Sequence, residues 1–113
     1  MIEKLKINKE FRRVYGRGKS QVTPFVVSYV MRQKGEKVRF GITVSKKIGS
    51  AVMRNRAKRV ITAAIRECLP HISGGCDIVL VARTRIVKVK SYDVSAALKA
   101  HLMALNMWVE NDK

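Results

Sequence analysis

Hydrophobic residues recur along this chain with two different periods, and each period predicts a different element. Phe11, Val14 and Tyr15 are spaced i, i+3, i+4, which places them on one face of a helix. Asn8 precedes them as a candidate N-cap. Gly18 follows them and favours the end of a helix. The pattern therefore predicts a short first helix whose aromatic face is either a core anchor or the border of a groove.

Residues 24–32 and residues 38–45 alternate with a period of two, which is typical of half-buried strands. The loop at 33–36 contains a glycine and predicts a hairpin between the two strands. One face of the second strand carries Arg39, a glycine, a threonine and a serine. This face is therefore either solvated or the floor of a shallow binding surface.

From Ser50, a natural N-cap, the period changes to that of a helix. Placed at about 100° per residue, one arc of this helix is apolar and the opposite arc is polar. The polar arc holds, in angular order, Arg54, Lys58, Thr62, Asn55, Arg66 and Arg59, while Arg56 lies on the other polar edge. The helix is thus predicted to present one face to a core and a basic stripe to solvent.

Residues 77–83 are apolar at nearly every position, which predicts a central strand covered on both faces. Strand, helix and strand in this order favour a βαβ unit with parallel pairing. Ser91 precedes a last amphipathic helix. The predicted fold is α+β, with residues 1–113 forming a single compact domain in the order helix–strands–helix–strand–helix around a mixed sheet.

Charge adds a candidate function to this fold. The chain has 24 Lys and Arg against 8 Asp and Glu, a net charge of +16. Cations such as Arg54 and Lys58 follow one another at i, i+4, where like charges destabilise an isolated helix. A polyanion would neutralise this repulsion, and nucleic acid is the commonest one. A membrane surface is the rival partner, but no basic amphipathic helix stands apart from the fold, so we expect no membrane partner.

The sequence also indicates where the protein acts. Met1 is not followed by an apolar signal segment, and no apolar run approaches the roughly 20 residues that span a bilayer. Cys68 and Cys76 have neither the spacing of a zinc site nor the number of a disulfide framework. We therefore expect reduced thiols and a cytoplasmic protein.

Catalytic patterns are missing from the sequence. The eight acids are scattered, and no pair shares an evident acid–base or metal site. His71 and His101 could in principle form a two-histidine phosphodiesterase, but a loop position and a helix-packing position account for them. Phosphate-binding glycine loops and nucleophile elbows are also missing. The residues predict a nucleic-acid binder with no catalytic residues of its own.

One segment resembles a known family. Residues 39–59 read RFGITVSKKIGSAVMRNRAKR, and this stretch resembles the signature of the bacterial ribonuclease P protein subunit. The Arg-Asn-Arg triplet followed by Lys58 and Arg59 is its most specific part, and the resemblance extends over nearly the whole chain. It implies a βαβ crossover that is left-handed, against the usual rule.

The resemblance also implies a function. The partner would be the catalytic ribonuclease P RNA, with one protein per RNA. The complex would remove the 5′ leader of precursor tRNA, with Mg²⁺ held mainly by RNA. This chain would be a subunit of the endoribonuclease while the chemistry takes place in the RNA.

Two surfaces follow from the resemblance. The RNA-facing residues would be Lys46, Lys47, Arg54, Asn55, Arg56, Lys58, Arg59 and Arg66. The leader-binding cleft would contain Phe11, Arg12, Tyr15, Arg17, Ser28 and Arg39. Thr62 departs from the family pattern, which often has Arg there; its hydroxyl can form a hydrogen bond but brings no charge for a phosphate.

Two other functions share the same composition. A structural RNA-binding protein of the ribosomal type would show similar charge and shape. A protein-only nuclease would cleave without an RNA partner. The Arg-Asn-Arg segment favours the ribonuclease P subunit over both.

Overall fold

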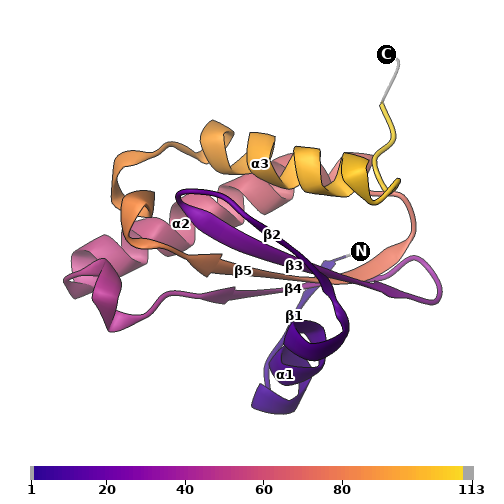
Figure 1. The fold of residues 1–113 in the computed structure, drawn as a ribbon, viewed down its shortest axis with the longest axis horizontal. Coiled ribbons are helices and arrows are strands. Elements are labelled where there is room, and N and C mark those ends of the chain that lie inside the picture. Colours follow the sequence, from indigo (N-terminus) through magenta and orange to yellow (C-terminus); the bar gives the residue numbers. More distant parts are fainter. Residues whose placement is uncertain (1, 111–113) are drawn as a thin grey trace.

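The computed structural model describes residues 2–110, in which two helices lie on one face of a sheet and one helix lies on the other (Figure 1). The strands are β1 (Ile2–Lys4), β2 (Lys19–Val22), β3 (Val26–Gln33), β4 (Val38–Thr43) and β5 (Gly75–Ala82). The helices are α1 (Asn8–Arg17), α2 (Ala51–Cys68) and α3 (Ser91–Ala104), with 3₁₀ turns η1 (Lys46–Ile48), η2 (Leu69–His71) and η3 (Thr84–Lys88). The predicted α+β order of elements is confirmed.

The sheet is mixed and has the strand order β1-β4-β5-β3-β2. β4 pairs in parallel with both β1 and β5, whereas β3 is antiparallel to β5 and to β2. Since α2 connects two parallel neighbours, β4 and β5, the predicted βαβ unit is confirmed. The left-handed sense of its crossover stays a prediction.

The predicted hairpin at residues 33–36 is wrong. β3 and β4 do not pair with each other, because β5 lies between them and pairs with both. β5 is buried at every position except Val81, which is half-buried. A strand that is apolar on both faces gains most by taking the centre of a sheet, so it separates two strands that are neighbours in sequence.

Two strands were missed by the sequence patterns. β1 and β2 are short and lie at the two edges of the sheet. β2 reads KSQV and is exposed at three of its four positions, so it carries no apolar alternation. Short, charged edge strands are a common protection against unwanted pairing, and their sequences resemble loops for the same reason.

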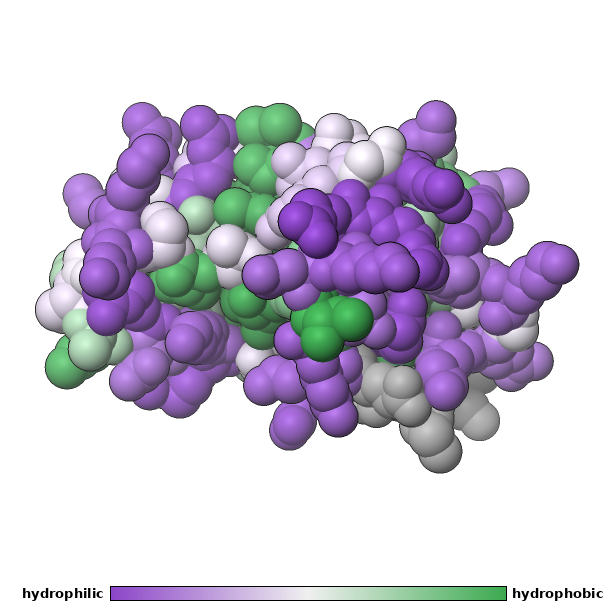
Figure 2. All heavy atoms as spheres, turned by 90° about the horizontal axis from the view of Figure 1, so that it is seen from below, coloured by the Kyte–Doolittle hydropathy of each residue, from purple (hydrophilic) through white to green (hydrophobic). Residues whose placement is uncertain are grey.

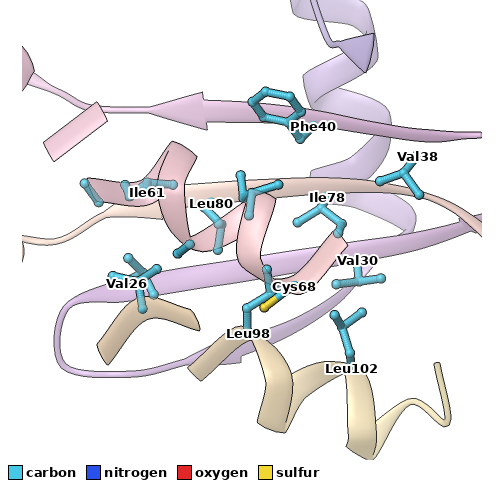
Figure 3. Packing of buried hydrophobic residues seen from close by; sticks show 14 of the residues in the cluster. Val26, Val30, Val38, Phe40, Ile61, Cys68, Ile78, Leu80, Leu98 and Leu102 are labelled. Atoms are coloured by element: carbon cyan, nitrogen blue, oxygen red, sulfur yellow. The ribbon is translucent and has the colours of Figure 1, made fainter. Parts of the chain in front are cut away.

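The main core lies between the sheet and the two helices α2 and α3 (Figure 3). Ile61 from α2, Ile78 and Leu80 from β5, and Leu98 and Leu102 from α3 are all fully buried. Burying each such side chain contributes about 1.5–3 kcal/mol. This core fixes the orientation of α2, and therefore the direction in which its polar face points.

The two free cysteines belong to this core. Cys68 and Cys76 are both buried. Burial raises the pKa of the Cys68 thiol to about 11 and that of the Cys76 thiol to about 12. Both thiols are therefore protonated at neutral pH and act as packing groups.

Helices α1 and α3 begin one residue earlier than the sequence predicted. Asn8 and Ser91 are the first helical residues and not the caps. The free amides are instead satisfied by carboxylates of the first turn: Glu10 accepts from the backbone of Lys6 and Ile7, and Asp93 accepts from that of Lys90. Within residues 2–110, no helix is long and apolar enough to cross a membrane.

Candidate nucleic-acid interface

The direction in which the basic stripe of α2 points is determined by the N-cap of this helix and by the packing of its buried side. The Ser50 hydroxyl accepts a hydrogen bond from the Met53 amide at 3.3 Å, which confirms Ser50 as the N-cap. Ala57, Ile61 and Ile65 are buried against the sheet and α3. The opposite side of the helix therefore faces solvent, as the projection predicted, although Arg54 and Thr62 on it are half-buried.

The exposed cations of the stripe are Lys58, Arg59 and Arg66. Together with Thr62 and Ala63 they line a shallow hollow of about 340 Å³. None of these three cations takes part in an ion pair among the described residues. Because their charges are not neutralised by the protein, this hollow is suited to an anion such as a backbone phosphate.

Two arginines of the Arg-Asn-Arg triplet are used within the protein. Arg54 donates from Nη1 to the Gly49 carbonyl at 2.8 Å. Arg56 donates from Nη2 to the Val89 carbonyl at 3.0 Å and from Nη1 to the Val87 carbonyl at 3.4 Å. Both side chains are half-buried, whereas Asn55 between them is exposed. Their role in RNA binding stays a prediction, and the structure adds a role in holding neighbouring loops.

Lys46 and Lys47 extend the basic surface beyond the start of α2. Both are exposed in η1, whose last residue, Ile48, is buried in the core. Ser45 fixes this turn, because its hydroxyl accepts from the Lys47 amide at 3.3 Å. The two lysines are thus presented by an anchored turn rather than by a free loop.

A second candidate surface lies beside α1, on the opposite face of the sheet. The Tyr15 hydroxyl lies 3.0 Å from Thr43 Oγ1, and the Tyr15 ring packs edge-on against Tyr29 with centroids 5.0 Å apart. Asn8, Phe11, Arg12, Tyr15 and Thr43 line a hollow of about 370 Å³. Figure 2 looks onto this side of the molecule and shows a band of hydrophobic residues between two hydrophilic areas.

Phe11 is both a packing residue and a wall of this groove. Its ring lies directly over Gly41, where an added Cβ would come within 2.5 Å of two ring carbons. Phe11 is half-buried, whereas Tyr15 is 38% exposed. Phe11 is therefore both a core anchor and a border of the groove, the two alternatives that the sequence left open. Tyr15 is the ring more open to a ligand.

The sheet face beneath α1 includes Thr43, which lines the hollow and belongs to the polar strand face that the sequence patterns indicated as a possible binding floor. Val27, Val81 and Thr43 are neighbours across β3, β5 and β4, and all three are half-buried. Tyr29 follows on the same face of β3. Alternation along β3 separates its two faces, but only the position of α1 identifies the face of Tyr29 as the groove face.

Ser28 does not belong to the groove, which corrects its assignment to the leader cleft. It alternates with Tyr29 and points to the other face of the sheet, where it is 3% exposed. Its hydroxyl lies 2.7 Å from Nδ1 of His101 on α3. Burial lowers the pKa of His101, so the pair is neutral and joins α3 to the sheet.

Arg39 lies on the groove face of the sheet but on the far side of α1 from Tyr15. It donates to both carboxylate oxygens of Asp77, at 2.9 and 2.7 Å, and to Glu10 of α1 at 2.9 Å. The Asp77 carboxylate raises the pKa of Arg39, while hydrogen bonds from the Lys6 and Ile7 amides, with Arg39, lower that of Glu10. Arg39 therefore holds α1 on the sheet, and its charge is balanced by two acids.

Arg12 and Arg17 are exposed on α1 and remain open to a ligand. Arg12 lines the hollow beside Tyr15, and Arg17 is the last residue of the helix. The histidines lie elsewhere: His71 stacks on Trp108, with centroids 4.5 Å apart, and His101 pairs with Ser28. No group of three or more His, Cys, Asp or Glu side chains that could hold a metal occurs within residues 2–110.

Comparison with known proteins identifies relatives over nearly the whole chain. The family model described as ribonuclease P matches residues 2–106. A ribonuclease P protein component of Thermoanaerobacter sp. (strain X514) is 37% identical over 112 residues, covering 99% of this chain and 97% of the relative. One from Clostridioides difficile (strain 630) is 38% identical over 96 residues, covering 84% of each chain.

Solved structures are similar as well. The RNase P protein of Staphylococcus aureus has a TM-score of 0.77 at 30% identity, covering 93% of this chain and 96% of the other. The RNase P protein of Thermotoga maritima has a TM-score of 0.76 at 26% identity, covering 96% and 99%. The chain is thus similar to these proteins in sequence and in fold.

Proposed function

This chain belongs to the ribonuclease P protein family, and from that premise we propose how its surface serves tRNA 5′ processing. A ribonuclease P protein component is part of a ribonucleoprotein. We propose that the stripe of α2 docks this chain on the catalytic RNA, one protein per RNA. The groove beside α1 then binds the 5′ leader of precursor tRNA. The place of action is the cytoplasm, where a bacterium processes its tRNA.

The observation that carries this proposal is the arrangement of two different surfaces on one small domain. Lys58, Arg59 and Arg66 offer charge without an ion pair among the described residues, which suits a structured RNA backbone. The groove offers Phe11 and Tyr15 beside an apolar floor, which suits the unstacked bases of a single strand. The stripe of α2 and the groove beside α1 lie on opposite faces of the sheet, so RNA can occupy both surfaces at the same time.

The chemistry of cleavage is assigned to the RNA partner. The described residues do not fit a protein-held metal site, because Asp77, their most buried acid, is fully engaged by Arg39 and Gln33. We propose that Mg²⁺ is held mainly by RNA. The protein contributes charge that lowers repulsion between two RNAs, and it orients the leader.

Reconstitution tests this function. Purified protein, the catalytic RNA and precursor tRNA would be combined at low Mg²⁺, and leader removal would be followed over time. We expect the protein to increase cleavage well above that by RNA alone. Equal cleavage with and without protein would favour a structural RNA-binding role. Cleavage by the protein without the RNA would favour a protein-only nuclease.

Tyr15→Ala tests the leader groove. Stacking is worth about 1–3 kcal/mol per base, so affinity for leader-bearing tRNA should fall roughly 5- to 150-fold. Affinity for mature tRNA, which has no leader, should not change. The measurement is the dissociation constant of the holoenzyme for each tRNA.

Tyr92→Ala is the matched control for this substitution. Tyr92 is 65% exposed on α3, on the other face of the sheet from the groove. It should leave both dissociation constants unchanged. Equal losses for leader-bearing and mature tRNA in Tyr15→Ala would mean that Tyr15 does not contact the leader.

A further inference from the structure

A cavity of about 550 Å³ lies where the β2–β3 turn meets η3, at the same end of the molecule as the first turns of α2 (Figure 1). One part of its wall is apolar and includes an aromatic ring, whereas the other part carries a hydroxyl and two cations. Arg85 and Lys88, the two cations, are exposed and form no ion pair among the described residues. The lining residues are Pro24, Phe25, Thr84, Arg85, Lys88 and Val89.

Contacts within the protein hold the walls of this cavity in place. Arg83 joins the turn to η3: its amide donates to the Phe25 carbonyl and its Nη1 donates to the Thr23 carbonyl, each at 2.9 Å. Ile86 anchors η3 itself, because its side chain is fully buried in the main core. The cavity is therefore formed by the fold and needs no ligand to shape it.

The cavity is joined directly to the helix that carries the basic stripe. Arg56 of α2 donates to the carbonyls of Val87 and Val89 at the end of η3. Arg59 of the stripe lies three positions further along, which makes it a surface neighbour of Arg56 on the helix. The turn η1, whose lysines extend the basic surface, also packs against η3. RNA that docks on the stripe therefore lies within reach of the cavity.

The leader groove lies on the other face of the sheet. Phe25 and Val89 pack against the main core, between the sheet and the helices α2 and α3. None of the residues that line the cavity lines the hollow beside Tyr15. An occupant of the cavity should therefore come from the RNA on which α2 docks and not from a leader in the groove.

The chemistry of the walls matches one unpaired nucleotide that projects from a folded RNA. The ring of Phe25, beside proline and valine, provides a surface on which a base can stack. Arg85 and Lys88 provide charge for the phosphate of the same nucleotide. Folded RNAs present unstacked bases in loops and bulges, and proteins commonly bind such bases on aromatic side chains. A base within a duplex is already stacked on its neighbours and is not open to Phe25.

We propose that this cavity binds an unpaired nucleotide of the catalytic RNA, with its base against Phe25 and its phosphate on Arg85 and Lys88. The proposal rests on the proposed docking of α2 on this RNA and adds a site that receives a single base. Phosphate contacts along the stripe carry no sequence information. A base in the cavity makes docking depend on one particular nucleotide of the RNA.

The test measures binding of the catalytic RNA without tRNA, so that no leader is present. At 0.1 M salt, Arg85→Ala/Lys88→Ala should bind the RNA roughly five- to eightfold more weakly. The slope of log affinity against log salt should decrease by ~0.7–0.9, the share of one phosphate. Phe25→Leu keeps an apolar side chain but removes the ring. It should weaken binding about fivefold or more and leave the slope unchanged, because it removes stacking and no charge.

Chemical probing of the RNA identifies the nucleotide. With reagents that modify unpaired bases of all four kinds, wild-type protein should protect one base that stays reactive in the presence of Phe25→Leu. Deleting this nucleotide from the RNA should weaken binding of the wild-type protein by the same factor as Phe25→Leu. Because both changes remove one contact, combining them should cause no further loss.

Lys4→Ala/Lys34→Ala is the matched control, because it removes two exposed cations that do not line the cavity. It should change affinity and slope only slightly. The free energy of unfolding of Phe25→Leu would be measured alongside, since this ring packs against the core. The double variant at Arg85 and Lys88 changes only exposed side chains, so it tests the cavity even if Phe25→Leu does not fold.

Three results would overturn the proposal: cavity variants that bind the RNA as wild type does, losses from Phe25→Leu and the nucleotide deletion that add, or losses confined to leader-bearing tRNA. The variant Lys58→Ala/Arg59→Ala/Arg66→Ala, titrated in parallel, reports on the docking itself. If it binds the RNA normally, the proposed docking fails. If it binds weakly while the cavity variants bind normally, the docking stands and the inference about the cavity fails.

Discussion

Removing the three exposed cations of α2 in Lys58→Ala/Arg59→Ala/Arg66→Ala is expected to weaken binding to the catalytic RNA by roughly 100- to 500-fold at 0.1 M salt. Each phosphate contact adds ~0.7–0.9 to the slope of log affinity against log salt, which is roughly five- to eightfold between 1 M and 0.1 M. The three side chains are exposed and have no ion-pair partner among the described residues, so the loss comes from charge. The slope itself should decrease by about 2–3.

The measurement is a titration of protein into RNA at several salt concentrations. Lys4→Ala/Lys6→Ala/Lys34→Ala is the matched control: it removes the same charge from exposed positions away from α2. It should reduce affinity only slightly, with little change in slope. If both triple variants behave alike, net charge and not the stripe determines binding. An unchanged slope in the α2 variant would mean that this face is only solvated.

Arg39→Met is expected to lower the free energy of unfolding by about 3 kcal/mol, since breaking a buried pair leaves an uncompensated charge. Asp77 is 1% exposed, and among the side chains of the described residues it would keep the hydrogen bond from Gln33. Glu10 would also lose its tie to the sheet, so α1 would be held less firmly. Affinity for leader-bearing tRNA should fall together with stability, although Arg39 lies away from Tyr15.

Denaturant unfolding of three variants separates the charge effect from the loss of packing. Arg39→Met/Asp77→Leu removes both charges, and replacing a buried pair by apolar groups is often close to neutral. The double variant should therefore be more stable than Arg39→Met alone. A single variant as stable as wild type would contradict the role assigned to this pair. Asp77→Asn provides a further check, because it keeps the shape and removes the charge.

The α2 stripe could be predicted from the sequence because everything that defines it is local. The cap at Ser50, the buried positions and the exposed cations follow from spacing along one helix. The same holds for β5, whose apolar run from Ile78 to Ala82 predicted a covered central strand. The family signature is also a local stretch, from Arg39 to Arg59, so it was readable before any fold was known.

The groove could be predicted only in part. Phe11 and Tyr15 were found from their helical spacing, but Ser28 was placed beside them and Tyr29 was not. Alternation along a strand separates two faces without saying which helix covers which face. Neighbouring residues of a strand point to opposite faces, so a shift of one position places Ser28, a core residue, in the groove instead of Tyr29.

By itself, the sequence determined the helices, the buried face of α2, the excess of positive charge and the family. Only the tertiary structure decided that β5 separates β3 from β4, that Arg39 and Arg56 are tied to other parts of the chain, and that the β2–β3 turn meets η3 at a cavity. The physical reason is the separation along the sequence of the residues that make each contact. Periodicity records whether a side chain is buried, whereas its partner is chosen by contacts between segments that are distant in sequence.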